Sequence, residues 1–494
     1  MSNDLDTIRR IRAWHEGRPT PRGAVRNVHV AADHDVLIVA FLRMGGESRP
    51  WGVAIGTLAD GPRVFTVPEA RNRDLVADMM IEVAPILLRH FRHPQWSHES
   101  PGGFQTQSLR QLWLPGPTHL EMLQFLAAAY ARTRWERPDV VTLRALGNLG
   151  NALFMEAQRP GQQILVSATE ALRTSYVFPA APMRQAHLGF LLGWLDTPGD
   201  RHARWSAAHD AERQSVSTVL DPDTERRELE PLVSAWGTDR SADTAHAIHH
   251  ALTRELERRW QLTASAVNAL RADHRATNAS IDKLVTKSAQ SFFHAWGERV
   301  MNEAAGLEPY WPNVFTDLNA RSASGSYHAR VADHDESRFW LVNGDRELQR
   351  EELAAGHGMI ASVVAVESGE WIVEWTYPDI TTIEPGKTLV VAGRTTMKLS
   401  VRDVDVDTRR MVLAPGWKRA KSSARHDWAA DDPKWQGSRL VFLADSPVGI
   451  MRRKITEARQ SVEHDITSLL LSPRSRHAAY DDDGPVVETA EADV

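Results

Sequence analysis

The chain contains no cysteine among its 494 residues. This absence excludes a disulfide framework, a thiolate zinc site, an iron–sulfur cluster and a cysteine nucleophile, and it favours a cytoplasmic protein. No stretch approaches about 18 consecutive apolar residues, and the charged beginning MSNDLDTIRRIR is unlike a signal peptide. We therefore expect neither export nor a membrane partner.

Several sequence motifs of enzymes are also missing. The chain has no GxxxxGK[ST] or GxGxxG loop to hold a phosphate, no HExxH pair for zinc and no GxSxG turn for a serine nucleophile. An ATP-driven motor requires the first of these loops nearly intact. We therefore expect no cofactor and no ATPase activity. A role other than catalysis is the leading expectation.

Charge is distributed unevenly over a chain whose formal net charge is −6. Residues 481–494 hold six acids and no base, so we expect a disordered acidic tail there. Residues 394–425 hold nine bases against three acids. Such a run is either a solvated face or a surface for nucleic-acid phosphates. The candidate nucleic-acid-binding residues are Arg409, Arg410, Trp417, Lys418, Arg419 and Lys421.

Hydrophobic periodicity divides the chain into segments. Residues 1–200 alternate strand-like runs such as VLIVAFL with amphipathic helical stretches, which predicts an α/β domain. Residues 201–305 have mostly helical spacing, with breaks at Asp221-Pro222 and Pro231, and the Gly, Pro and Ser content of 306–345 favours a linker region. Residues 346–445 contain short β-branched runs that predict a small β-barrel of SH3-like or OB-like kind. A helix within 446–480 and the tail complete this α+β multidomain organisation.

Two groups of residues are weak metal-site candidates. Asp33 and Asp35 follow an apolar run, and carboxylates at the end of a strand hold Mg²⁺ in two-metal nucleases, with Asp78 and Glu82 as further ligands. The alternative is that Asp-His-Asp forms an ordinary turn. His246 and His250 have the i, i+4 spacing of a bidentate metal site on a helix, or they belong to a solvated helix face.

The 17 tryptophans are many for a chain with six tyrosines. Trp371 and Trp375 alternate in EWIVEW, so we expect them to face the barrel core. Trp417 and Trp428 lie in the polar, basic segment, where an indole face can stack on an unpaired base.

Two parts of the sequence resemble regions of known helicases. The segments QLWLPGPTHLEMLQFL and EAQRPGQQILVSATEALRTSYVFP resemble the ribonuclease H-like region ahead of some bacterial helicases. The runs GMIASVVAVESGEWIVEW, IEPGKTLVVAG and LSVRDVDVDTRRMVLAP resemble the accessory, non-motor 1B barrel of superfamily 1B helicases of the Dna2 and Upf type. The resemblance implies nucleic-acid handling without an ATPase. The carboxylates of a nuclease site cannot be assigned in this sequence.

These observations leave three functional hypotheses. The first is an accessory subunit that binds DNA or RNA beside a separately encoded helicase or nuclease, in phage defence or genome maintenance. The second is a Mg²⁺- or Mn²⁺-dependent nuclease with a ribonuclease H-like site that uses Asp33 and Asp35. The third is a scaffold that binds only proteins.

Overall fold

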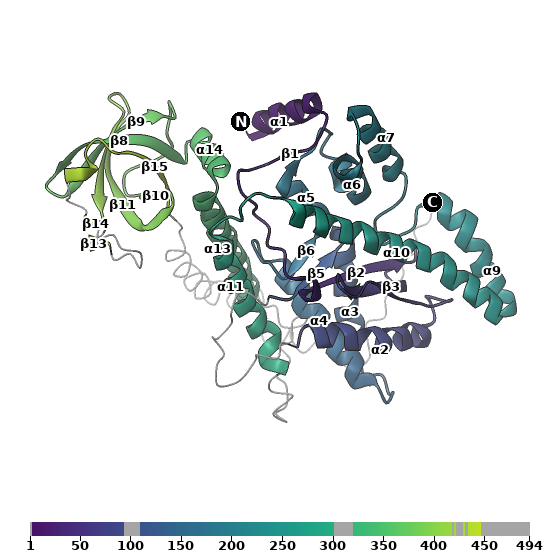
Figure 1. Cartoon of the computed structure of the whole chain (residues 1–494). Coiled ribbons are helices and arrows are strands. Elements are labelled where there is room, and N and C mark those ends of the chain that lie inside the picture. The colour runs from purple at the N-terminus through teal and green to yellow at the C-terminus, as the bar shows by residue number, and fades with distance from the viewer. Residues whose placement is uncertain are drawn as a thin grey trace, which may run out of the picture. The chain divides into compact units, whose positions relative to one another are not determined.

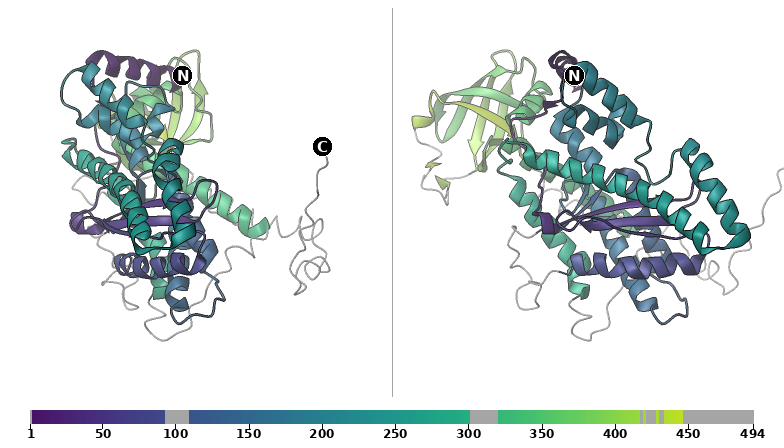
Figure 2. Two further views of the ribbon diagram at one scale, coloured as in Figure 1. Left: turned by 90° about the vertical axis from the view of Figure 1, so that its right-hand side faces the viewer. Right: turned by 45° about the vertical axis from the view of Figure 1, so that its right-hand side comes forward.

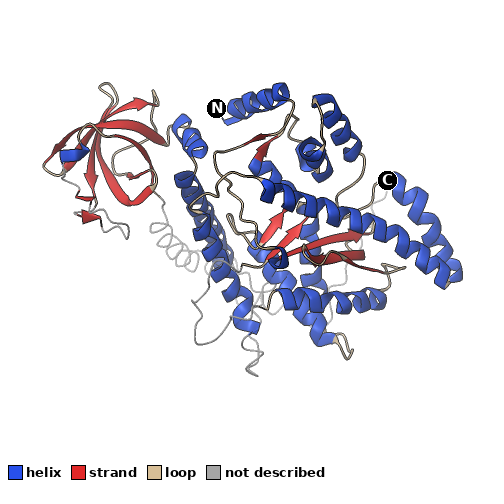
Figure 3. Cartoon of the chain, viewed as in Figure 1, coloured by secondary structure: helices blue, strands red, loops and turns tan. Residues whose placement is uncertain are grey.

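The computed structural model describes residues 2–92, 109–300, 320–416, 419–420, 428–429 and 433–445. The chain divides into two units, of which the first comprises 1–309 and 337–445. This first unit contains an open sheet with helices on its faces and a separate closed barrel (Figures 1 and 3). The mixed α/β class and the C-terminal barrel expected from the sequence are therefore confirmed.

The N-terminal sheet has five strands in the order β4-β3-β2-β5-β6. Within this sheet, the first three strands along the chain are β2 (Val36–Arg43), β3 (Pro50–Thr57) and β4 (Arg63–Thr66), and they form an antiparallel meander. Two later strands, β5 (Gln111–Leu114) and β6 (Leu165–Ser167), join β2 in parallel. The first strand thus becomes the central one.

The two faces of the sheet are covered by helices that enter between and after its strands (Figures 1 and 2). Helices α2 (Arg73–His90) and α4 (Val140–Ala157) cover one face, and the long helix α10 (Ala242–Ala272) crosses the other. Helix α2 continues through Pro85, although proline lacks the backbone N–H that a helix interior uses. Because both faces are covered, the first seven residues of β2 are buried, and the run is apolar without alternation.

Further elements connect these layers. The 3-10 turn η1 (Asp33–Asp35) precedes β2, and η3 (Pro117–His119) and α3 (Leu120–Tyr130) follow β5. Beyond β6 the chain forms α5 (Ala168–Ser175), α6 (Leu188–Asp196) and α7 (Arg201–Glu212), then α9 (Glu230–Asp239), α10 and α11 (Ile281–Phe292). The helical middle segment expected from the sequence is confirmed over its described residues.

The barrel closes in the order β10-β11-β12-β9-β8-β15. Its strands are β8 (Gly358–Glu367), β9 (Glu370–Tyr377), β10 (Thr388–Val391), β11 (Arg394–Asp405), β12 (Arg410–Pro415) and β15 (Arg439–Ala444), and each strand pairs antiparallel with its neighbours. Trp371 and Trp375 are buried among its apolar side chains, as predicted. Closure leaves no free sheet edge.

One segment differs from the sequence-based expectation. Residues 320–344, expected within a linker, form helix α13 (Ala320–Gly344), which α14 (Arg346–Ala354) follows. Val342 packs against Val390 and Leu443 of the barrel, with Phe339 beside them. Tertiary packing of these side chains stabilises a helix that the Gly and Ser content of its first turns disfavours.

None of the described helices is long and apolar enough to cross a lipid bilayer. The expected helix within 446–480 and the expected acidic tail lie outside the described residues.

Candidate functional site

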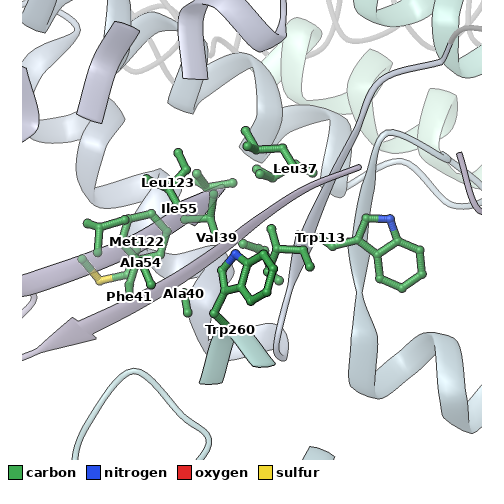
Figure 4. Packing of buried hydrophobic residues seen from close by; sticks show 14 of the residues in the cluster. Leu37, Val39, Ala40, Phe41, Ala54, Ile55, Trp113, Met122, Leu123 and Trp260 are labelled. Atoms are coloured by element: carbon green, nitrogen blue, oxygen red, sulfur yellow. The ribbon is translucent and has the colours of Figure 1, made fainter. Parts of the chain in front are cut away.

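Ligands of open α/β sheets bind at the carboxyl ends of their parallel strands. A site of this sheet is therefore expected at the carboxyl ends of β2 and β5. Apolar side chains dominate the middle and this end of β2: Val39, Ala40 and Phe41 are fully buried, and Met122 and Leu123 of α3 lie close to them (Figure 4). At the same end, the carboxylate of Glu121 of α3 lies 3.8 Å from the guanidinium of Arg43, the last residue of β2.

Strand β5 pairs with β2 only as far as Ile38. Beyond that point, the side chain of His119 lies beside β2. Its Nδ1 accepts a hydrogen bond from the backbone N–H of Phe41 at 3.1 Å, and its Nε2 lies 3.1 Å from the carbonyl oxygen of Val216. Nδ1 is therefore the unprotonated nitrogen, and Nε2 donates. Burial lowers the pKa of His119 to about 3, although the hydrogen bond to Val216 opposes this shift. The imidazole is neutral and fully occupied, so it is a structural group rather than a proton carrier.

The segment Gln214–Leu220, here called the closing loop, covers the same end of the sheet. The backbone N–H of Arg43 donates to the carbonyl of Thr218 at 2.7 Å, and the Arg43 Nε donates to the Thr218 hydroxyl at 3.1 Å. Together with the His119–Val216 bond, these contacts bind the loop to the last residues of β2. The closing loop therefore lies against the carboxyl end of β2.

Arg259 of α10 holds the closing loop from the other side. Its guanidinium is fully buried and donates to the carbonyls of Ser217 at 2.8 Å and Val219 at 3.2 Å. It also forms an ion pair with Glu255 at 2.7 Å. Burial lowers the pKa of Arg259 to about 10, so the charge persists at neutral pH. Burial alone would raise the pKa of Glu255, but Arg258 and Arg259 outweigh it and hold that pKa below its ordinary value.

The carboxylates of Asp33 and Asp35 lie at the opposite end of β2. Both residues belong to the 3-10 turn η1, which is the turn that the sequence offered as the alternative to a metal site. Since β2 has eight residues, its two ends are about 25 Å apart. Asp33 forms an ion pair with Arg271, and the buried Asp35 lies 3.7 Å from Arg110. Arg110 also donates to the carbonyls of Arg89 and His90 at the end of α2. These aspartates therefore stabilise the turn that precedes β2.

The remaining metal candidates are not brought together. Asp78 and Glu82 share an exposed face of α2, where Asp78 pairs with Arg137 at 2.6 Å. His246 and His250 are exposed on α10, and the neighbouring His249 contacts the Thr66 hydroxyl through Nδ1 at 2.8 Å. Among the described residues, no group of three or more His, Cys, Asp or Glu side chains is placed to hold a metal ion.

The described part of the basic segment is paired with acids. Arg409 contacts Asp379 at 3.2 Å and Arg410 contacts Glu374 at 3.2 Å, both across neighbouring parts of the barrel. Further pairs join Arg402 to Glu370 and Lys398 to Asp445. The positive excess along the sequence is therefore reduced in space by acids that lie outside 394–425. Trp417, Lys418 and Lys421 lie outside the described residues, and for Arg419 and Trp428 only the backbone, in strands β13 (Arg419–Ala420) and β14 (Trp428–Ala429), is described.

Sequence reasoning did not identify His119, Arg259 or the closing loop. A histidine directly after Gly-Pro-Thr and an arginine on a helix have no spacing that distinguishes them from surface residues. The one available signal is that His119 follows a strand and precedes an apolar helix, which is a position of frequent burial.

Comparison of the chain with known proteins finds no matching protein family, no similar curated protein and no similar solved structure.

Proposed function

We propose that this chain is a nucleic-acid-binding accessory protein whose N-terminal domain is ribonuclease H-like and non-catalytic. The observation that supports it most is the sheet, in which an antiparallel meander is extended by two parallel strands with the first strand at the centre. We take this arrangement as that of the ribonuclease H-like domain that the sequence resembles. The strand order therefore supports the resemblance.

The absence of catalysis is supported by the carboxyl end of β2. A two-metal nuclease needs several carboxylates around its cations. At this end Ala40 and Phe41 are apolar, His119 is neutral, and the carboxylate of Glu121 is paired with Arg43. The closing loop covers it, bound by Arg43 and Arg259. Placing a metal there would require further ligands.

The barrel supports the accessory role. Six antiparallel strands enclose an apolar core, and helices α13 and α14 precede the barrel. The basic segment beyond Pro415 supplies Lys418, Arg419, Lys421 and Arg425 to contact phosphates. The partners are then DNA or RNA and a helicase or nuclease.

Fluorescence anisotropy of labelled single-stranded DNA and RNA, titrated with the full chain at several salt concentrations, tests the proposal. We expect binding whose logarithm falls linearly with the logarithm of salt concentration. If the chain binds neither single-stranded DNA, nor single-stranded RNA, nor a duplex at low salt, nucleic-acid binding is rejected.

One observation favours a second candidate, a scaffold that binds proteins alone. Four bases of 394–425 have acidic partners, which weakens their attraction for phosphates: Lys398, Arg402, Arg409 and Arg410. The same titration separates the two functions, because a scaffold shows no salt-dependent binding of oligonucleotides.

A further inference from the structure

We propose that one end of the barrel binds a protein segment that carries basic residues next to apolar ones. This surface, here called the acidic rim, consists of the loop Tyr377–Thr382 after β9 and the turn Asp405–Arg409 between β11 and β12. Its large apolar side chains are exposed: Tyr377 to 43%, Ile380 to 79% and Val406 to 59%. A cluster of exposed apolar side chains on a folded domain marks an interaction surface.

The two parts of the rim lie side by side. Strands β9 and β12 are neighbours in the barrel, and Glu374 is paired with Arg410 in their register. The backbone N–H of Trp375 donates to the carbonyl of Arg409 at 3.0 Å, and the Arg409 guanidinium lies 3.2 Å from the Asp379 carboxylate. These contacts bring the exposed side chains of loop and turn to the same barrel end.

Both parts are also ordered before any partner binds. The Asp405 carboxylate accepts hydrogen bonds from the backbone N–H groups of Asp407 at 3.0 Å and Thr408 at 3.1 Å. Hydrogen bonds to Thr408 hold the pKa of Asp405 below its ordinary value. At the other end of the loop, the Thr382 backbone N–H and hydroxyl both donate to the carbonyl of Gly356. A preorganised surface loses little conformational entropy on binding.

The charge of the acidic rim favours a basic partner. Asp379, Asp405 and Asp407 carry three negative charges, against the single positive charge of Arg409. A polyanion would be repelled, while a basic segment would be attracted. In addition, β12 runs away from the rim, from Arg410 to Pro415.

This inference deepens the proposed function, since the bound segment would belong to the protein partner named there. The test uses the full chain with isotope-labelled isoleucine methyl groups. The probes are a short synthetic peptide of alternating leucine and arginine and its leucine and glutamate counterpart. The methyl signal of Ile380 is assigned with Ile380→Val, and the buried Ile383 is the internal reference.

We expect the arginine peptide to shift the Ile380 signal with saturation, the glutamate peptide to leave it unchanged, and the Ile383 signal to stay in place. Asp379→Asn and Asp407→Asn should each weaken peptide binding about two- to fivefold, the usual effect of one exposed ion pair. The matched control is Asp210→Asn on the exposed surface of α7, which should have no effect.

The proposal is overturned if neither peptide shifts Ile380, or if both shift it equally, because the rim would then lack charge selectivity. It is also overturned if a single-stranded oligonucleotide shifts Ile380, since the rim would then be a nucleic-acid surface. Failure of the oligonucleotide to bind anywhere rejects the proposed nucleic-acid binding and leaves the peptide result standing.

Discussion

Buried polar residues keep the carboxyl end of the N-terminal sheet closed. His119 and Arg259 are both inaccessible to solvent, and each is bonded to carbonyl oxygens of the closing loop. A buried donor is tolerated only when it has such partners. These residues therefore define the geometry of this end rather than a reaction there.

The neutral state of His119 has a consequence for stability. Its pKa is about 3 in the folded chain and about 6.5 when unfolded, so the unfolded chain binds one more proton between these values. The free energy of unfolding should fall as pH is lowered from about 6.5, by up to about 1.4 kcal/mol per pH unit for this residue. Above about pH 6.5 the contribution is complete and flat.

Replacing His119 by Phe should reduce that pH dependence and cost about 2–4 kcal/mol near neutral pH, since the Phe41 N–H and the Val216 carbonyl lose their partner. Urea unfolding followed by tryptophan fluorescence at several pH values measures both effects. His90, whose pKa burial also lowers to about 3, keeps its own dependence in the variant. If the free energy of unfolding of His119→Phe depends on pH as steeply as that of the parent chain, His119 is not the source of the pH dependence.

At the scale of elements, close packing of α3 against α4 depends on a glycine. A Cβ on Gly147 would lie 2.3 Å from the backbone nitrogen of Ala131 and 2.7 Å from the carbonyl carbon of Tyr130. Backbone atoms at a helix end cannot move aside cheaply, so the helices must separate.

Gly147→Ala should therefore destabilise the chain by about 1–3 kcal/mol, despite the higher helix propensity of alanine. The matched control is Gly237→Ala on α9, where a Cβ meets nothing within 4 Å. This control should gain about 0.5–1 kcal/mol. Thermal or urea unfolding compares them, and equal effects of the two substitutions would show that the contact is not tight.

The basic segment gives a second prediction at this scale. Because Arg409 and Arg410 have acidic partners, Arg409→Gln with Arg410→Gln should leave the salt dependence of nucleic-acid binding nearly unchanged. Changing Lys418, Arg419 and Lys421 to Gln should reduce the slope of log affinity against log salt by about 2 to 3. Trp417→Ala should weaken single-strand binding by about 1–3 kcal/mol with little change of slope, since stacking releases few ions. Anisotropy titrations separate these effects. A large change of the salt slope in the Arg409→Gln, Arg410→Gln variant would show that these arginines contact phosphates despite their acidic partners.

For the whole molecule, the positions of the acids predict an absence of metal-dependent cleavage. Asp33 and Asp35 stabilise the entry to β2, away from the closed carboxyl end. Full-length protein with Mg²⁺ or Mn²⁺ should leave single- and double-stranded substrates intact on denaturing gels. Asp33→Ala and Asp35→Asn should bind nucleic acid like the parent chain. Cleavage that either substitution abolishes would replace the accessory function with the nuclease hypothesis.

Local patterns in the sequence determined much of the architecture. The sequence predicts a strand within 28–42 and helices at 69–92 and 138–157, and these contain β2, α2 and α4. The β-branched runs after 358 correspond to the barrel strands. Strand and helix periodicities arise from neighbouring residues, so they can be read along the chain. The burial of Trp371 and Trp375 followed from the same alternation.

Other features were decided only by the tertiary structure. The parallel pairing of β2 with β5, the burial of His119 and Arg259, and the pairing of Arg409 with Asp379 join residues that are distant in sequence. The letters Asp-His-Asp form a 3-10 turn at 33–35 but belong to helix α13 at 333–335. Their local conformational preference is the same, so the difference comes from the surroundings. A local charge count or motif cannot include partners brought close by folding, and for this reason the candidate sites changed more than the fold did.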